Sequence, residues 1–170
     1  MMIRRSVGED FAQILAIIND GAQAYRGVIP ADRWHDPYMP AFELEKQIRE
    51  GVEFSVAEDE GRMLGVMGIQ DRGDVALVRH AYVSTQSQRG GVGTKLLKHV
   101  QGLTSKPILI GTWADASWAI GFYERNGFEV LTKPDIERLL RRYWSIPDRQ
   151  VETSVVLADQ RWLKLADAHA

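Results

Sequence analysis

The chain has 170 residues, of which 45% are hydrophobic and 26% are charged, and its net charge is −2. This balance is typical of an ordinary globular domain. It excludes a generally basic nucleic-acid coat protein, because such binding depends on neutralising phosphates. The absence of cysteine excludes disulfides, a thiol nucleophile and thiolate metal sites. The four histidines never stand at metal-ligand spacing, so we expect no metal.

The first third of the chain predicts one short strand and two helices. Residues 3–6 favour the strand, and Phe11, Ile14, Leu15 and Ile18 follow at the spacing of an amphipathic helix. A second helix is expected over residues 41–50, with Gly51 as its C-cap. Residues 25–40 hold three prolines and three large aromatic residues, so we expect an irregular loop there.

The middle of the chain predicts a β-meander followed by alternating helices and strands. Strands are expected over residues 52–58, 62–71 and 74–84, with turns at Gly61 and Gly73. After them we expect helices near 92–103 and 115–126, from Pro134 onward and after Asp159, with strands at 107–113, 127–131 and 153–157. We expect the last of these strands to close the sheet. The fold class is therefore α/β, a mixed sheet with helices on its faces.

No apolar run approaches the roughly 18 residues that cross a bilayer. The basic start is followed by Gly8, Glu9 and Asp10, where a signal peptide would carry its apolar core. We therefore expect a cytoplasmic protein of one domain without a membrane partner. The sequence leaves a homodimer open.

A glycine-rich turn joins the third strand of the meander to the next helix. Gln88-Arg89-Gly90-Gly91-Val92-Gly93 removes side chains at the start of that helix, whose first amides have no partner within it. These features favour an anion cradle suited to a pyrophosphate, with Arg89 adding charge. The glycine spacing fits neither a P-loop nor a dinucleotide-binding turn. On the glycines alone, a tight turn without a ligand remains the alternative.

Two motifs resemble the GNAT superfamily of acyl-CoA-dependent N-acyltransferases. Gln88-x-x-Gly91-x-Gly93 is similar to that family's [QR]-x-x-G-x-[GA] motif and follows a strand, as it does there. About 30 residues later, a helix carrying Ala119 and Tyr123 ends in Gly127-Phe128, which is similar to the second family motif. The order of elements resembles this fold over residues 2–157, which leaves 158–170 as a C-terminal tail.

The resemblance implies that acetyl-CoA lies between the strand that ends at Val83 and the strand that ends at Trp113. It implies that the Val83 amide donates to the thioester carbonyl, where an oxyanion forms. Tyr123 aligns with the general acid that protonates the leaving thiolate. The alternative for Tyr123 is a packed aromatic residue. The residues expected to bind the cofactor are Val83, Ser84, Thr85, Gln88, Arg89, Gly90, Gly91, Val92, Gly93 and Thr94.

Two positions depart from the family pattern. Leu77 stands where some relatives carry a glutamate base, and Ala116 stands where many carry an asparagine that contacts CoA, a role left to Ser117 or Asp115. His80 has a suitable pKa for the base, but strand alternation points it away from the Leu77 side. A structural histidine or a water chain is the alternative.

The resemblance implies an amine acceptor, either a small molecule or a peptide. Aromatic and polar residues that would suit such a pocket are Tyr25, Trp34, Tyr38, Arg79 and Trp113. Each aromatic residue has a core-covering alternative, and Arg79 has a cross-strand ion pair. Lys133, Arg138, Arg141, Arg142 and Arg149 form a basic stretch that is a solvated helix face or a contact for an anionic partner. No nucleic-acid motif accompanies it.

The expected function is an acetyl-CoA-dependent N-acetyltransferase with no metal, in which the acceptor amine attacks the thioester directly. The departures at Leu77 and Ala116 keep one alternative open, namely a non-catalytic module that binds acyl-CoA and regulates. The two differ in whether thiol is released from the bound cofactor.

Overall fold

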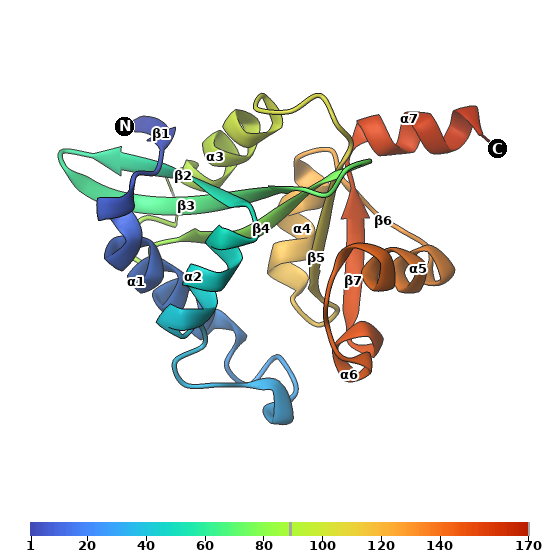
Figure 1. Ribbon diagram of the computed structural model, residues 1–170, viewed down its shortest axis with the longest axis horizontal. Helices are drawn as coiled ribbons and strands as arrows, with labels where there is room; N and C mark the ends of the chain where they lie inside the picture. Colours follow the sequence, from blue (N-terminus) through green and yellow to red (C-terminus); the bar gives the residue numbers. More distant parts are fainter. Residues whose placement is uncertain (89, 170) are drawn as a thin grey trace. The chain divides into compact units, whose positions relative to one another are not determined.

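The computed structural model describes residues 1–88 and 90–169 (Figure 1). It confirms the α/β fold, a mixed sheet of seven strands flanked by helices. The chain forms two compact units, each with its own apolar core. The first unit comprises Met1–Arg26, Trp34–Asp71 and Val78–Ser105. The second comprises Gly27–Arg33, Arg72–Leu77 and the chain from Lys106 onward.

The first unit holds the predicted meander. Its strands are β1 (Met2–Arg5), β2 (Val52–Asp59), β3 (Arg62–Asp71) and most of β4 (Ala76–Val83), in that order across the sheet. β1 and β3 both pair antiparallel with β2. The helices are α1 (Phe11–Gly21), α2 (Ala41–Arg49) and α3 (Val92–Gln101). These bounds lie within about two residues of the expected ones, because burial imposes the helical and strand periods on the sequence.

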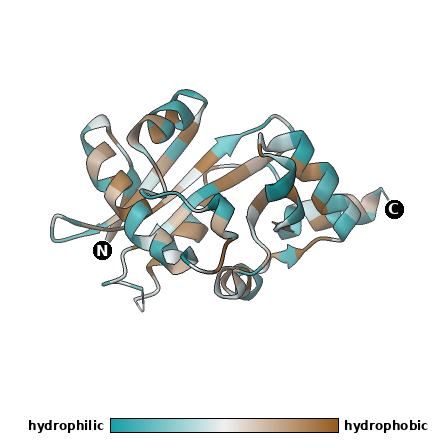
Figure 2. Cartoon of the chain, turned by 90° about the horizontal axis from the view of Figure 1, so that it is seen from below, coloured by the Kyte–Doolittle hydropathy of each residue, from teal (hydrophilic) through white to brown (hydrophobic). Residues whose placement is uncertain are grey.

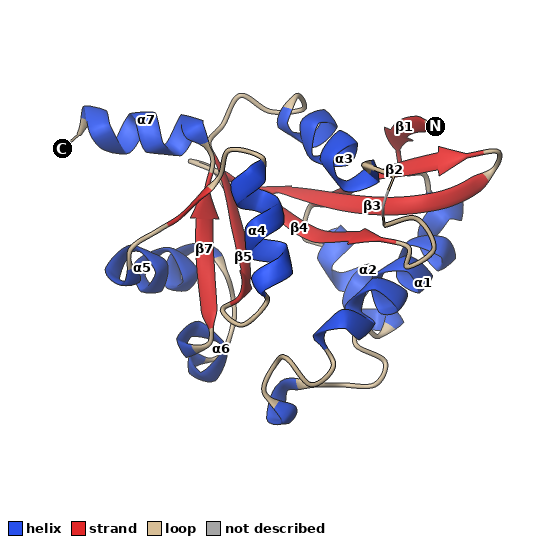
Figure 3. Cartoon of the chain, turned by 180° about the vertical axis from the view of Figure 1, so that it is seen from behind, coloured by secondary structure: helices blue, strands red, loops and turns tan. Residues whose placement is uncertain are grey.

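Opposite faces of this meander receive different helices (Figure 3). Ile14 and Ile18 of α1 and Leu44 of α2 pack with Phe54 and Val56 of β2 in one core cluster. α3 approaches the other face at Gly65, where an added Cβ would lie 3.1 Å from a methyl carbon of Leu96. A side chain at Gly65 would therefore force the neighbouring atoms to give way by a few tenths of an ångström.

The second unit contains the start of β4 and the strands β5 (Ile108–Trp113), β7 (Ser154–Ala158) and β6 (Glu129–Val130). β7 pairs antiparallel with both β5 and β6, so it lies inside the sheet rather than closing it. The expectation that this strand closes the sheet is therefore wrong, because chain order does not determine spatial order. β6 is also shorter than the five residues expected.

Four helices accompany these strands: α4 (Ser117–Arg125), α5 (Lys133–Tyr143), α6 (Asp148–Glu152) and α7 (Gln160–Ala168). α5 contributes Leu139 and Leu140 to a core that also contains Leu77 and Val156. In Figure 2 the strands of both units are largely brown, while the helices alternate between teal and brown as amphipathic helices do. The sequence analysis did not predict α6, whose five residues are too few to show a period.

The C-terminal stretch contains the helix expected after Asp159, which is α7. Asp159 is 4% exposed, and its side chain accepts a hydrogen bond of 3.1 Å from the Trp162 amide, which caps α7. Trp162 packs against the core of the second unit. The cap therefore fixes the turn of α7 that carries this indole. No described helix is both long and apolar enough to cross a membrane.

Candidate active site

The glycine-rich turn ends at the N-terminus of α3 in the first unit. Gly91 is the N-cap and has φ of 72°, a left-handed backbone that favours glycine. The first bond of the helix runs from the Lys95 amide to the Gly91 carbonyl at 3.1 Å, so the helix offers no acceptor to the amides of residues 91–94. Within the described residues no side chain caps this end, and a Cβ on Gly91 would meet nothing within 4 Å. The helix therefore directs several amide donors and its positive dipole end at open space.

The loop before this helix is tied down at several points. The Ser84 amide donates to the Leu64 carbonyl at 2.8 Å, and the Ser87 amide donates to the Ser84 carbonyl at 2.8 Å. The Thr85 amide and hydroxyl donate to the Asp20 carboxylate at 2.9 and 3.2 Å. Nothing in the sequence singles out Asp20 at the end of α1 for this role. The Ser84 and Thr85 amides are therefore used inside the protein and do not serve as donors to a ligand.

The remaining residues of the expected cofactor set lie where the sequence analysis expects them. Val83 is the last residue of β4, Gln88 and Gly90 lie in the turn, and Val92, Gly93 and Thr94 form the first turn of α3. Val92 is buried, so its contribution to a ligand is its amide. Arg89, expected to add charge here, lies outside the described residues.

Tyr123 lies in the second unit, in the last turns of α4. Its ring makes edge contacts with Phe122 and Phe128 at centroid distances of 5.1 and 5.8 Å, and the residue is 7% exposed. Gly127, with φ of 89°, turns the chain so that the Phe128 amide donates to the Tyr123 carbonyl at 3.1 Å. The second motif thus builds one local unit, in which the glycine and phenylalanine hold the ring of the tyrosine.

The two departures from the family pattern have clear positions. Leu77 is fully buried in the core of the second unit, so its site in β4 is apolar. Ala116 is the N-cap of α4 and is fully buried, with no side-chain cap on that helix among the described residues. Neither position offers a polar group.

His80 in β4 has φ of 57°, which is unusual for a residue with a side chain. Its ring stacks on Phe54 at 6.2 Å, and its Nε2 is hydrogen-bonded to the Gln47 side chain from α2. Burial, and secondarily the neighbouring charge of Arg79, lowers the pKa of His80 from 6.5 to about 3. A ring with so low a pKa takes up a proton poorly at neutral pH, so these contacts favour a structural role over that of a base.

Side chains of a regular strand alternate between its two faces, but this rule does not hold past His80 in β4. The left-handed backbone of His80 rotates the residues that follow it. Arg79 donates to Gln70 Oε1 on β3 at 3.1 Å, a cross-strand bond to a neutral amide that the sequence did not single out. Gln70 is itself buried and donates to the Glu50 carbonyl at 3.2 Å.

The loop after α1 brings three of the expected acceptor residues together. Tyr25 stacks on Tyr38 at 6.2 Å, and Trp34 lies 5.8 Å from Tyr38. Arg26 lies over the Trp34 ring at 5.2 Å, and Tyr82 of β4 meets Tyr25 edge-on at 6.3 Å. Tyr82 is a member of this aromatic cluster that the sequence analysis missed. Trp113 belongs to the second unit, where it is 8% exposed at the end of β5.

The basic stretch around α5 is neutralised within the second unit. Arg138 pairs with Asp135 at 3.0 Å, Arg141 with Asp148 at 2.8 Å and Arg142 with Asp74. Arg149 approaches Asp32 at 3.6 Å. These pairs favour the solvated helix face over a general surface for an anionic partner.

Comparison with known proteins agrees with these motifs. Residues 50–130 match the family model of the acetyltransferase (GNAT) domain. This range includes β2 to β5, the glycine-rich turn and all of α4.

Solved structures resemble the chain in fold over nearly its whole length. One is an acetyltransferase of the GNAT family from Staphylococcus aureus Mu50, with a TM-score of 0.68 and 17% identity, covering 93% of this chain and 97% of that one. Another is the PaiA N-acetyltransferase from Thermoplasma acidophilum in complex with coenzyme A, with a TM-score of 0.69 and 15% identity over the same shares.

A third is the ribosomal-protein-alanine N-acetyltransferase from Brucella melitensis, with a TM-score of 0.61 and 18% identity, covering 93% of this chain and 98% of that one. At these identities the likeness concerns the fold, while the matched domain model carries the family. Residues 50–130 of the chain therefore match an acetyltransferase (GNAT) domain, and the fold is the one seen in solved GNAT acetyltransferases.

Proposed function

We propose that this chain is an acetyl-CoA-dependent N-acetyltransferase that acts on a primary amine of a small molecule, an amino acid or a peptide. The observation that carries the proposal is the uncapped start of α3 at Gly91, which opens on empty space. The amides of residues 91–94 bind the pyrophosphate of the cofactor there. The structure of PaiA with coenzyme A, which has a similar fold, supports this cofactor.

In the proposed reaction the amine nitrogen attacks the thioester carbonyl carbon. The Val83 amide donates to the oxygen, which gains negative charge as the tetrahedral intermediate forms. The carbon–sulfur bond then breaks, and the Tyr123 hydroxyl gives its proton to the leaving thiolate. Since His80 and Leu77 supply no base, water takes the proton that the amine loses. Holding amine and thioester together provides much of the remaining acceleration.

The acceptor is proposed to meet the aromatic cluster of Tyr25, Trp34, Tyr38 and Tyr82, which offers ring faces and edges to a small amine. The Brucella protein of similar fold is named for a peptide amine, the alanine of a ribosomal protein. An assay should therefore include amino acids, alkylamines and short peptides with a free N-terminus.

Tyr123→Phe tests the chemical role assigned to the tyrosine. We expect kcat to fall by roughly 10²–10⁴-fold, because the thiolate loses its acid, while the affinity for acetyl-CoA changes little. Thiol release over the amine panel and calorimetric titration with acetyl-CoA measure the two effects. Phe122→Leu, which alters the neighbouring ring and leaves the hydroxyl in place, is the control. Unchanged turnover in Tyr123→Phe would remove the residue from the mechanism.

The apolar positions Leu77 and Ala116 favour one second candidate, a module that binds acyl-CoA without turning it over. In this case the wild-type chain binds acetyl-CoA in calorimetry but releases no thiol with any acceptor of the panel. Thiol release with at least one amine of the panel would exclude the non-catalytic module.

A further inference from the structure

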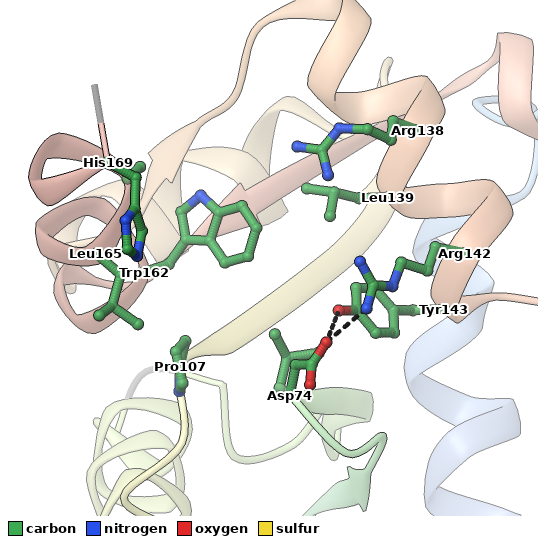
Figure 4. Close-up of a pocket in the computed structure, with 11 residues that line it drawn as sticks. Asp74, Pro107, Arg138, Leu139, Arg142, Tyr143, Trp162, Leu165 and His169 are labelled. Carbon is green, nitrogen blue, oxygen red and sulfur yellow. Dashed lines mark hydrogen bonds and ion pairs between the residues drawn. The ribbon is translucent and has the colours of Figure 1, made fainter.

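A cavity in the second unit lies outside the elements of the proposed active site. Its volume is about 340 Å³, within the range of small-molecule sites. It is lined by residues of α5 and α7, by the chain that leads into β4 and by Pro107 before β5 (Figure 4). The glycine-rich turn, Tyr123 and the aromatic cluster contribute nothing to it.

One part of the lining is apolar. The apolar residues of the lining are Val75, Pro107, Leu139, Trp162, Leu165 and Ala166. The Asp159 cap holds the Trp162 backbone, and its side chain packs against the core while lining the cavity. The apolar part suits the hydrocarbon body of a ligand, and the flat indole suits an aromatic ring in particular.

The charged part of the lining is mainly cationic. Among the described lining residues Asp74 is the one acidic side chain, beside Arg138, Arg142 and His169. Its Oδ2 already accepts bonds from Arg142 at 2.5 Å and from the Tyr143 hydroxyl at 3.3 Å. Arg142 also lies over the Tyr143 ring at 5.1 Å, so this group of three is committed internally. A cationic ligand would have to compete for Asp74 with an arginine that is already in place.

Two groups beside the cavity can donate hydrogen bonds to a ligand, namely the Arg138 guanidinium and the Trp162 indole N–H. Figure 4 shows the Arg138 guanidinium extending over Leu139 toward Trp162. Among the described residues the Trp162 indole N–H has no acceptor, and Arg138 has one partner, Asp135. This pair is an i,i+3 bridge whose side chains are 54% and 43% exposed, and such surface pairs contribute little to stability. A second carboxylate can therefore share or displace Asp135 at low cost.

We propose that this cavity binds a small organic carboxylate with an aromatic or branched apolar body. The body lies against Trp162 and Leu165, and the carboxylate accepts charge-assisted hydrogen bonds from Arg138 and a further bond from the indole N–H. The described lining of this cavity shares no residue with the proposed acetyl-CoA site. A test of carboxylate binding here therefore does not depend on the proposed enzymatic activity.

The test compares three probes of one shape and different charge: 3-phenylpropionate, 3-phenylpropan-1-ol and 3-phenylpropylamine. The readout is the indole N–H signal of Trp162 in ¹H–¹⁵N spectra, assigned with Trp162→Phe. We expect the acid to shift this signal saturably and to bind about tenfold more tightly than the alcohol, the difference that one charge-assisted bond provides. The amine should bind most weakly.

Arg138→Met should weaken the acid about tenfold and bring it level with the alcohol. Arg141→Met is the matched control, because Arg141 stands on the same helix, is exposed and bonds Asp148, but does not line the cavity. It should leave the affinity of the acid unchanged. Equal affinity of acid and alcohol in the wild type, an unmoved Trp162 signal, or equal losses in both arginine variants would overturn the proposal.

Discussion

His80 places a titratable ring inside the first unit, between Phe54 of β2 and Gln47 of α2. Its left-handed backbone is tolerated because these neighbours hold the ring on both sides. Few residues with a side chain adopt this φ without such support. The hydrogen bond between His80 and Gln47 therefore helps to stabilise the left-handed backbone of β4 at His80, shortly before Val83.

This burial makes a prediction about pH. Since the pKa of His80 is about 3 in the folded chain and 6.5 in the unfolded one, the unfolded state binds more protons below pH 6.5. The contribution of His80 to stability is therefore lost as the pH falls from about 6.5 toward 3. Between pH 7 and pH 5 this loss amounts to about 2 kcal/mol.

His80→Asn removes the titration and keeps a residue that tolerates the left-handed backbone. Denaturant unfolding at pH 7 and pH 5 should show the wild type losing about 2 kcal/mol more than the variant. Asp10, whose pKa is lowered mainly by its bond to Arg4, is present in both chains and cancels in this difference. Equal pH slopes would mean that His80 protonates freely in the folded protein.

At the scale of elements, the start of α3 depends on the loop that precedes it. The Asp20 carboxylate holds both polar groups of Thr85, which anchors the loop to the end of α1. This anchor fixes the first part of the loop, at Thr85, relative to α1.

Gly91→Asp tests this helix end. The added carboxylate would fill the open space and take the amides that the pyrophosphate needs, so we expect affinity for coenzyme A to fall on the order of 100-fold. Gly61→Asp is a close control, because Gly61 also has a positive φ, 76°, and open surroundings, but lies in the β2–β3 turn. Calorimetry with coenzyme A should separate the two variants. Similar affinity in both would refute the assignment of the turn.

Most helices and strands could be predicted from the sequence, because the spacing of their apolar residues follows from which face of each element is buried. Ile14 and Ile18 recur on one face of α1, and the alternation along β2 and β3 reflects the two faces of the sheet. It did not predict the insertion of β7 between β5 and β6, since that placement depends on packing between distant segments.

The residues of the candidate site likewise fall into those that local motifs mark and those that depend on distant contacts. The glycines and Tyr123 could be proposed for the site because local motifs carry them, whereas Asp20, Gln47 and Gln70 act through distant partners. Their roles depend on which segments the fold brings together, so no local pattern marks them. The backbone of His80 was missed for this reason too.

At the scale of the whole molecule, the two units are interleaved along the chain. The second unit takes Gly27–Arg33 from the loop after α1, and it takes Arg72–Leu77 from the β3–β4 turn and the start of β4. β4 begins in the second unit with Ala76 and Leu77 and continues into the first. Neither unit is therefore a continuous segment that could be cut out at a single linker.

This connectivity predicts that the units unfold together. Leu77→Ala removes a fully buried side chain from the second unit and should cost about 2–5 kcal/mol. Because β4 is continuous, we expect the first unit to lose its structure in the same transition. Four of the five tryptophans lie in the second unit, so fluorescence follows mainly that unit while far-UV circular dichroism follows both.

The two signals should therefore shift together in Leu77→Ala, and again in Leu44→Ala, which opens an equally buried position in the core of the first unit. The second variant is the more demanding one, because its cavity is remote in sequence from most of the fluorescent reporters. If fluorescence kept its wild-type midpoint in Leu44→Ala while the dichroism signal fell early, the units would be separate folding domains, and the shared strand would not couple them.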